Sequence, residues 1–313
     1  MTLDDTEIDY LTVLVPVTIT DAMLISCTVA EPAAGDPAAW NAATNYAVGD
    51  LVLRTTTHRI YKALVAGTNA GLPEATPTRW FDFDSSSRWC ALDNKPGAAT
   101  VSAASPLTYV LRPGRVDTLW LGGVDAAHVV VTVKDMTGGT VVFTYDADLE
   151  ASEPPDYYEY FFSPFLPETD LLLYDLPPYN DMEITVTLTS STPISLSVLA
   201  VGVTSFLAES LCGASAKPRS FATIKLDENG NNKTTQGAAT KDLTLKGLIS
   251  DIDAVDTAVD TVTRYLTTNC LWSGSADPSY TALRSYGLGS AQFDYTDPET
   301  VEVTITVQGV LSP

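Results

Sequence analysis

The sequence predicts a mainly β protein with one amphipathic helix near its C-terminal end. Short apolar segments end repeatedly at turn residues such as Arg112-Pro113-Gly114 and Thr137-Gly138-Gly139, which is typical of β-sandwiches. Along 301–309, apolar and polar residues alternate cleanly, the pattern of a half-buried strand. Helical periodicity is confined to 251–266, where apolar residues recur at steps of three and four.

Length and composition indicate a folded protein of two or three domains. The chain has 313 residues, of which 45% are hydrophobic and 18% are charged. No run approaches the roughly eighteen apolar residues that a membrane-spanning helix needs, so we expect no membrane insertion. The first residues are acidic and lack the basic start of a signal peptide, so secretion by the usual route is not expected.

The chain is strongly acidic, with a net charge of −22 from 39 acids against 17 lysines and arginines. Such a charge repels phosphate backbones, which argues against nucleic acid as a partner. The acids are spread along the chain instead of forming one tail. This distribution suits solubility, neighbours with basic patches, or a saline habitat.

Residues that could carry chemistry are few and isolated. Four cysteines stand far apart without a CxxC pair, so we expect small buried hydrophobes and neither a zinc site nor a disulfide scaffold: Cys27, Cys90, Cys212 and Cys270. The two histidines, His58 and His128, have no nucleophile motif around them. We therefore predict no catalytic residue, no metal site and no cofactor, and a protein that is not an enzyme.

The first 37 residues contain two strand-like segments and a Pro/Gly linker. The segments lie within 10–30 and cannot form a domain alone. We expect them to lend strands to a distant domain or to a neighbouring subunit. A small β unit follows at 38–86, in which Gly49-Asp50 supplies a turn and 54–59 connects two short strands as a hairpin.

Four aromatic residues dominate this small unit: Trp40, Tyr46, Tyr61 and Trp80. A unit of roughly forty-five residues lies near the limit for an independent core, and aromatic side chains bury the most area each. Core packing is therefore the favoured interpretation of all four. The alternative is an exposed platform for a sugar ring, which makes the same four the candidate carbohydrate-binding residues.

Residues 88–207 read as a β-sandwich, most simply a jelly roll, with strand signals separated by turns. The most aromatic stretch of the chain is an insertion at 153–162. Mixed aromatic and acidic residues suit a protein contact or a sugar site, and we favour a packed loop or subunit interface. The candidate interface residues are Tyr157, Tyr158, Tyr160 and Phe161.

Residues 210–313 predict a β domain with the helix at 251–266. Ser250 can cap the helix, and Asp253 fits a capping box with it. The side chains expected to face the sheet are Ile252, Val255, Val259, Val262 and Leu266.

The small unit carries the most position-specific pattern in the chain, in this order: Trp40; Tyr46-Ala47-Val48-Gly49-Asp50-Leu51-Val52; Ile60-Tyr61-Lys62-Ala63; Asn69; Pro73; and Trp80. It resembles the small chitin-binding-type carbohydrate-binding modules, whose core runs W…YxxGDxV…xYxA…N…P…W. The resemblance implies a small β module with a sugar ligand. Leu72 and Leu64-Val65 stand where these modules usually place the tryptophans on which sugars stack.

Taken in order, the chain is similar to a family of bacteriophage tail-tip proteins, many of which carry such a module. The likeness rests on the module and on three further stretches: 111–117, 158–162 and 175–179. The C-terminal unit is similar in layout to the tube-forming domain of distal tail proteins. The resemblance implies a structural subunit of a tail tip or baseplate, made in the host cytoplasm and located in the virion.

The same resemblance implies partners. They are other tail or baseplate proteins, further copies of the chain in a ring around the tail axis, and host surface glycans. Two alternatives are kept beside it. One is a carbohydrate-binding adhesin for host recognition. The other is an enzyme such as a polysaccharide depolymerase, which would need two carboxylates placed across a cleft, and no acid in the sequence stands out for that role.

Overall fold

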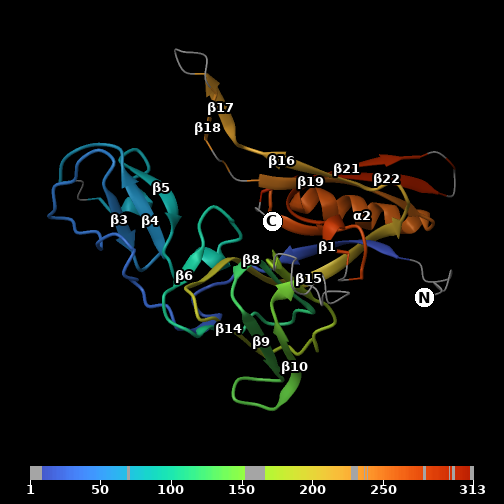
Figure 1. Cartoon of the computed structure of the whole chain (residues 1–313), viewed down its shortest axis with the longest axis horizontal. Helices are drawn as coiled ribbons and strands as arrows, with labels where there is room; N and C mark the ends of the chain where they lie inside the picture. The colour runs from blue at the N-terminus through green and yellow to red at the C-terminus, as the bar shows by residue number, and fades with distance from the viewer. Residues whose placement is uncertain are drawn as a thin grey trace.

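The computed structural model describes residues 9–68, 71–151, 166–226, 232–235, 237, 239–277, 280–295, 297 and 300–310. It confirms the mainly β fold, with 51% of residues in strands and, in the described part of the chain, a single α-helix, α2 (Ile252–Tyr265). A small sheet lies to one side, a sandwich lies below, and a sheet with α2 against it lies above (Figure 1). None of the helices described is long and apolar enough to cross a membrane.

One large antiparallel sheet runs through most of the molecule. Its strands, in spatial order, are β13 (Asp170–Leu173), β8 (Thr118–Asp125), β15 (Ile194–Ser210), β1 (Tyr10–Pro16), β20 (Cys270–Ser273), β21 (Arg284–Asp294), β22 (Val301–Gly309), β19 (Ala239–Ile249) and β16 (Ser215–Ser220). A tenth strand, β6 (Thr100–Ser102), pairs with the start of β15. β15 is 17 residues long and joins β8 at one end to β1 and β19 at the other, so the sheet continues across residues 207–210, where the sequence suggested a domain boundary.

The N-terminal strand finds its partners within the same chain. β1 lies between β15 and β20, with Tyr10 opposite Glu209 and Thr12 opposite Ser273. Gly202 lies opposite Pro16, and a Cβ atom at this glycine would clash with the backbone carbonyl of Val15. The expected distant partner is thus the central strand of the chain's own sheet, and the backbone groups of β1 need no neighbouring subunit.

A second sheet completes the sandwich. Its order is β10 (Val141–Asp148), β9 (His128–Lys134), β14 (Glu183–Thr189), β7 (Leu107–Leu111) and β2 (Leu24–Cys27). Alternate residues of β9 and β14 are fully buried against β8 and β15, as the period-2 pattern requires. The shared core includes Leu119, Leu121, Val129, Val131, Val133, Ile184, Val186, Leu188, Leu196 and Val201.

The small module is a three-stranded sheet, β3 (Leu51–Arg54), β4 (Arg59–Ala63) and β5 (Trp80–Ser85). The expected hairpin is confirmed, with Leu53 opposite Ile60. Its turn places His58 at a φ of 56°, a left-handed conformation that suits the tight reversal. One 3₁₀ turn, η1 (Pro73–Ala75), lies within the module between β4 and β5, and a second, η2 (Cys90–Leu92), follows β5.

Helix α2 packs on β19 and β21 through its central turns. Val255, Ala258 and Val262 are buried there and Val259 is half-buried, whereas Ile252 and Leu266 are 45% and 42% exposed. The predicted face was therefore right for the central residues and wrong for Ile252 and Leu266, because these two are the first residue and the C-cap of the helix and their side chains are open to solvent.

The cap of this helix also differs from the prediction. The N-cap is Asp251, whose carboxylate accepts a hydrogen bond from the Asp253 amide at 3.1 Å, and not Ser250. Either residue type can cap a helix, so the choice depends on where the chain leaves β19.

Two short ladders lie apart from these sheets. β11 (Glu150–Ala151) pairs with β12 (Leu166–Pro167), and β17 (Thr223–Leu226) pairs with β18 (Asn232–Thr235). The β17–β18 ladder projects well away from the body beyond β16 and β19 (Figure 1). A third 3₁₀ turn, η3 (Thr281–Leu283), precedes β21.

Candidate functional site

The four candidate sugar-binding aromatics come together as the core of the small module. Tyr46, Tyr61 and Trp80 are 9%, 6% and 2% exposed, and Trp40 is half-buried against them. The rings of Tyr46 and Trp80 meet edge to face, with centroids 5.2 Å apart. The guanidinium of Arg54 covers the Trp40 ring at 5.2 Å. This arrangement matches the core interpretation and leaves little ring surface for a sugar.

The exposed aromatic surface of the module lies elsewhere, on β5. Phe81 and Phe83 are 54% and 49% exposed. Lys62 lies opposite Phe81 across the strand pair, and its ammonium is 5.9 Å from the Phe83 ring centroid. Neither phenylalanine is among the binding residues predicted from the sequence. Their alternation with Asp82 and Asp84 was the available signal of an exposed strand surface.

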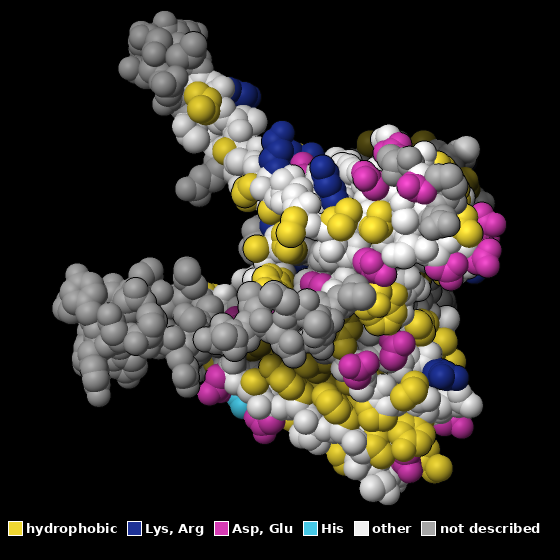
Figure 2. Space-filling view, turned by 90° about the vertical axis from the view of Figure 1, so that its right-hand side faces the viewer, with side chains coloured by type: hydrophobic (Ala, Val, Ile, Leu, Met, Phe, Trp, Pro, Cys, Tyr) yellow, Lys and Arg dark blue, Asp and Glu magenta, His cyan; other side chains and the backbone are white. Residues whose placement is uncertain are grey.

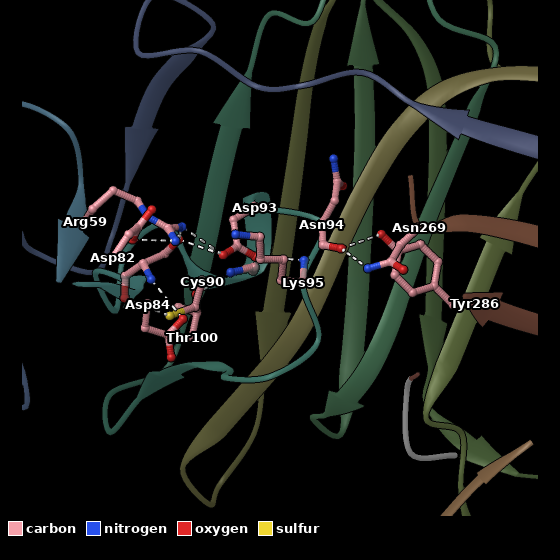
Figure 3. A network of polar contacts seen from close by, with 12 residues as sticks. Arg59, Asp82, Asp84, Cys90, Asp93, Asn94, Lys95, Thr100, Asn269 and Tyr286 are labelled. Atoms are coloured by element: carbon pink, nitrogen blue, oxygen red, sulfur yellow. Dashed lines mark hydrogen bonds and ion pairs between the residues drawn. The ribbon is translucent and has the colours of Figure 1, made fainter. Parts of the chain in front are cut away.

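A polar network joins the module to the body (Figure 3). At its centre, the Asp93 carboxylate accepts a hydrogen bond from the Ser85 hydroxyl at 2.6 Å and lies 3.4 Å from the Arg59 guanidinium. Arg59 in turn donates to Ser85 at 2.6 Å and pairs with Asp82 at 2.8 Å. Burial raises the pKa of Asp93, and the hydrogen bond from Ser85 opposes that rise.

The next residue continues the network toward the C-terminal sheet. Asn94 has a φ of 58°, and its carbonyl accepts hydrogen bonds from the Tyr286 hydroxyl at 3.0 Å and the Asn269 amide at 3.1 Å. Tyr286 is buried and stacks on Trp120 with ring centroids 4.7 Å apart. The short segment 85–94 thus contacts the module on one side and the large sheet on the other.

The linker before the module is held by the same segment. Glu31 accepts a hydrogen bond from the Ser86 hydroxyl at 2.6 Å and pairs with His58 Nδ1 at 2.7 Å. The His58 ring stacks on Trp89 with centroids 4.3 Å apart. Asp36 accepts from both the amide and the hydroxyl of Ser87. These contacts, together with the Asp93 network, fix the orientation of the module on the body.

We expect Asp93→Ala to lower the free energy of unfolding by about 1–3 kcal/mol, because it leaves the Ser85 hydroxyl and the Arg59 guanidinium without their shared half-buried acceptor. Urea denaturation would measure the loss. Asp82→Ala is the matched control, since Asp82 also pairs with Arg59 but its side chain is 53% exposed, and it should cost less than about 1 kcal/mol. Equal losses in the two variants would contradict a structural role for Asp93.

A second polar cluster closes the seam between the sandwich and the C-terminal sheet. It lines a cavity of about 200 Å³ between β8, β13 and β21. Asp170 forms an ion pair with Arg284 at 2.9 Å, and the Arg284 side chain is only 3% exposed. The Asp170 carboxylate also accepts a hydrogen bond from the Trp120 indole at 3.3 Å. Burial lowers the pKa of Lys241, whose ammonium donates to the Thr281 carbonyl at 2.8 Å. These polar groups therefore satisfy one another by hydrogen bonds and an ion pair where the sandwich meets the C-terminal sheet.

The histidine outside the module lies on the surface of the sandwich. His128 is flanked by Asp146 at 3.0 Å and Asp148 at 2.7 Å, both on the neighbouring strand β10. Within the described ranges, no group of three or more His, Cys, Asp and Glu side chains is placed to hold a metal ion.

The cysteines follow the expectation only in part. Cys90 and Cys270 are buried, and burial raises the pKa of each thiol to about 12, so both are protonated at neutral pH. Cys27 is half-buried. Cys212 is exposed, which corrects the prediction that all four are buried, because it lies in the turn between β15 and β16 and not in a strand facing the core.

An ion pair on the module gives its stability a predictable dependence on pH. Hydrogen bonds from the Arg54 guanidinium, at 2.8 and 3.2 Å, lower the pKa of Glu74. A lowered folded-state pKa gives stability that is present above the unfolded pKa and is lost as the pH falls through the folded pKa. We expect Glu74→Gln to remove this part of the acid dependence, at a neutral-pH cost below about 1 kcal/mol because the pair is partly exposed.

Thermal unfolding of wild type and Glu74→Gln between neutral and acidic pH would check this. The two curves should converge as the pH falls. Curves that stay parallel would contradict the assignment of the Arg54–Glu74 pair.

The candidate interface residues, Tyr157, Tyr158, Tyr160 and Phe161, lie outside the described residues. Comparison of the chain with protein-family models, with curated proteins and with solved structures found no match.

Proposed function

We propose that this chain is a structural subunit of a bacteriophage tail tip or baseplate, present in symmetric copies around the tail axis, and not an enzyme. The observation that carries the proposal is how the buried and half-buried charged residues are used. Asp93 and Arg59 join the module to the body, and Asp170 and Arg284 join two parts of the large sheet. Polar groups that hold the module and the parts of the large sheet in one orientation suit a scaffold that must keep a fixed shape.

Two further features support a scaffold. A single sheet passes through β15 from the sandwich to the C-terminal unit, so a continuous hydrogen-bonded ladder joins the two units. The residue patterns that resemble tail-tip proteins also lie in order along the chain. We expect no turnover of host polysaccharide by the purified protein, with or without added metal.

The test is the composition and labelling of phage particles. Mass spectrometry of purified particles should find the chain in several copies per particle, and gold-labelled antibody should mark the distal end of the tail. Absence from purified particles, or labelling of the capsid alone, would overturn the proposal.

A second candidate function is carbohydrate binding by the module, and one observation favours it. Phe81 and Phe83 offer two exposed rings beside Lys62, a combination on which a sugar ring can stack and hydrogen-bond. The aromatic residues chosen from the sequence do not offer this, because they form the core. An adhesin role would therefore use the β5 surface of the module.

Retention on insoluble chitin and on a panel of immobilised bacterial glycans tests this role. Phe81→Ala with Phe83→Ala should abolish retention, whereas Val48→Ala, at a residue 67% exposed elsewhere on the module, should not change it. No retention of the wild-type chain on any glycan, or equal retention of the double variant, would remove this function from the β5 surface.

A further inference from the structure

The positive charge of this acidic protein is concentrated in one segment. Residues 215–246, which we name the basic arm, hold six of the 17 lysines and arginines and three of the 39 acids, a net charge of +3. The rest of the chain holds eleven cations and 36 acids, a net charge of −25. Figure 2 shows the dark-blue side chains gathered at the base of the arm, with acidic side chains spread over the body below it.

The outer part of the arm, β17 and β18, has little support from the rest of the described chain, whereas its inner part at 239–246 lies in β19, which pairs with β16 on one side and β22 on the other. β16 is the outermost strand of the large sheet, and β17 and β18 pair with each other as a separate ladder that projects from the body (Figure 1). All the side chains described on this ladder are exposed. An isolated two-stranded ladder is marginally stable in water, so the arm has stability to gain from a partner.

The surface of the arm combines apolar and positive groups. Phe221 and Ile224 are 51% and 69% exposed. Lys217, Lys225 and Lys246 are also exposed, and within the described residues no ion pair involves them. Exposed apolar side chains rimmed by cations match the usual layout of a protein–protein contact, in which apolar anchors lie inside a charged rim.

We infer that the basic arm is an assembly contact that docks on the acidic body of a second copy of this chain. The inference rests on the proposed function, because it names the contact that would join neighbouring copies. A body of charge −25 offers the complementary surface. The two copies as a whole repel each other, but at physiological ionic strength screening limits this repulsion to about 8 Å, so the arm and body charges at the contact set the orientation. Since the arm and the body are different surfaces, the contact is head-to-tail, which generates a ring when the rotation closes.

Nucleic acid is the competing occupant of a basic surface. A phosphate backbone would pair with the lysines but offers no apolar surface to cover Phe221 and Ile224, whereas a second copy offers acidic and apolar groups together.

Sedimentation velocity on the full-length chain tests the contact. The wild type should self-associate near physiological salt, where the repulsion between the two acidic bodies is screened, and should dissociate as the salt concentration rises well above it. The triple variant K217E/K225E/K246E should weaken self-association by about tenfold or more, because like charges then face each other. The matched control K62E/R112E/R115E reverses three exposed cations outside the arm, gives the same net charge of −28, and should weaken it much less.

An uncharged pair of variants tests the apolar part of the same contact. Ile224→Ser should also weaken association about tenfold, whereas Val101→Ser, at a residue 56% exposed on the sandwich, should leave it unchanged. Unchanged thermal unfolding of each variant would show that a loss of association is not a loss of folding.

Three results would overturn the inference. The first is a wild type that stays monomeric at every protein and salt concentration, and the second is an equal effect of the two triple variants. The third is a wild type that is retained on immobilised DNA while its arm variants still self-associate normally. None of these depends on finding the chain in a virion. Self-association through the arm by a protein absent from particles would keep this contact and refute the proposed function. Finding the chain in particles with its arm exposed would instead support the proposed function and refute this contact.

Discussion

Replacing Val255 by Asp should lower the free energy of unfolding by about 3–5 kcal/mol. Val255 is 1% exposed and packs in the cluster that α2 forms with the C-terminal sheet, so the carboxylate would be buried among apolar side chains without a partner. Urea denaturation monitored by circular dichroism would measure the change. Val259→Asp, at a half-buried position, should cost less, since its carboxylate can reach water.

Ile252→Asp is the control for this helix. Ile252 lies on the same helix at 45% exposure, and its substitution should cost less than about 1 kcal/mol. A Val255→Asp protein that unfolds at the wild-type urea concentration would mean that α2 does not pack on the sheet through this face.

Replacing Trp80 by Ala should remove the core of the small module and cost about 3–5 kcal/mol. Trp80 is 2% exposed and packs on Tyr46, and the cluster around it is small, with Trp40, Tyr46, Val52, Tyr61 and Ala63 as its other members. A unit of this size has little stability to lose, so we expect the module to unfold while the large sheets stay folded.

Limited proteolysis would show this local unfolding as new cleavage sites within 38–86, with the sandwich and C-terminal sheet still protected. Phe81→Ala, at the neighbouring exposed residue, should leave the cleavage pattern unchanged. A Trp80→Ala protein that resists protease like the wild type would favour a surface role for this tryptophan.

Local periodicity explains what the sequence predicted well. Residues Val301, Val303 and Ile305 alternate with polar neighbours, and all three are buried in β22. The helix begins and ends within one residue of its predicted range. Strand and helix patterns repeat over a few residues, so they can be read without knowing the rest of the fold.

Contacts between distant residues could not be predicted in this way. β1 showed a strand pattern, but its partners β15 and β20 lie about 190 and 260 residues further along the chain, so local sequence cannot identify them. Asp93, Arg59 and Glu31 are single charged residues in turns and strand ends, with no spacing that marks them as partners. Phe81 and Phe83 were visible as aromatics, but their exposure depends on which face of β5 the module covers.

The central claim, a structural subunit repeated around a tail axis, is tested most directly by electron cryo-microscopy of the intact phage tail. Density at the tail tip should fit this chain in several symmetry-related copies, with the three-stranded module held on the body as the Asp93 network places it. A tail whose tip is fully accounted for by other proteins, or that holds this chain as one copy off the axis, would contradict the claim.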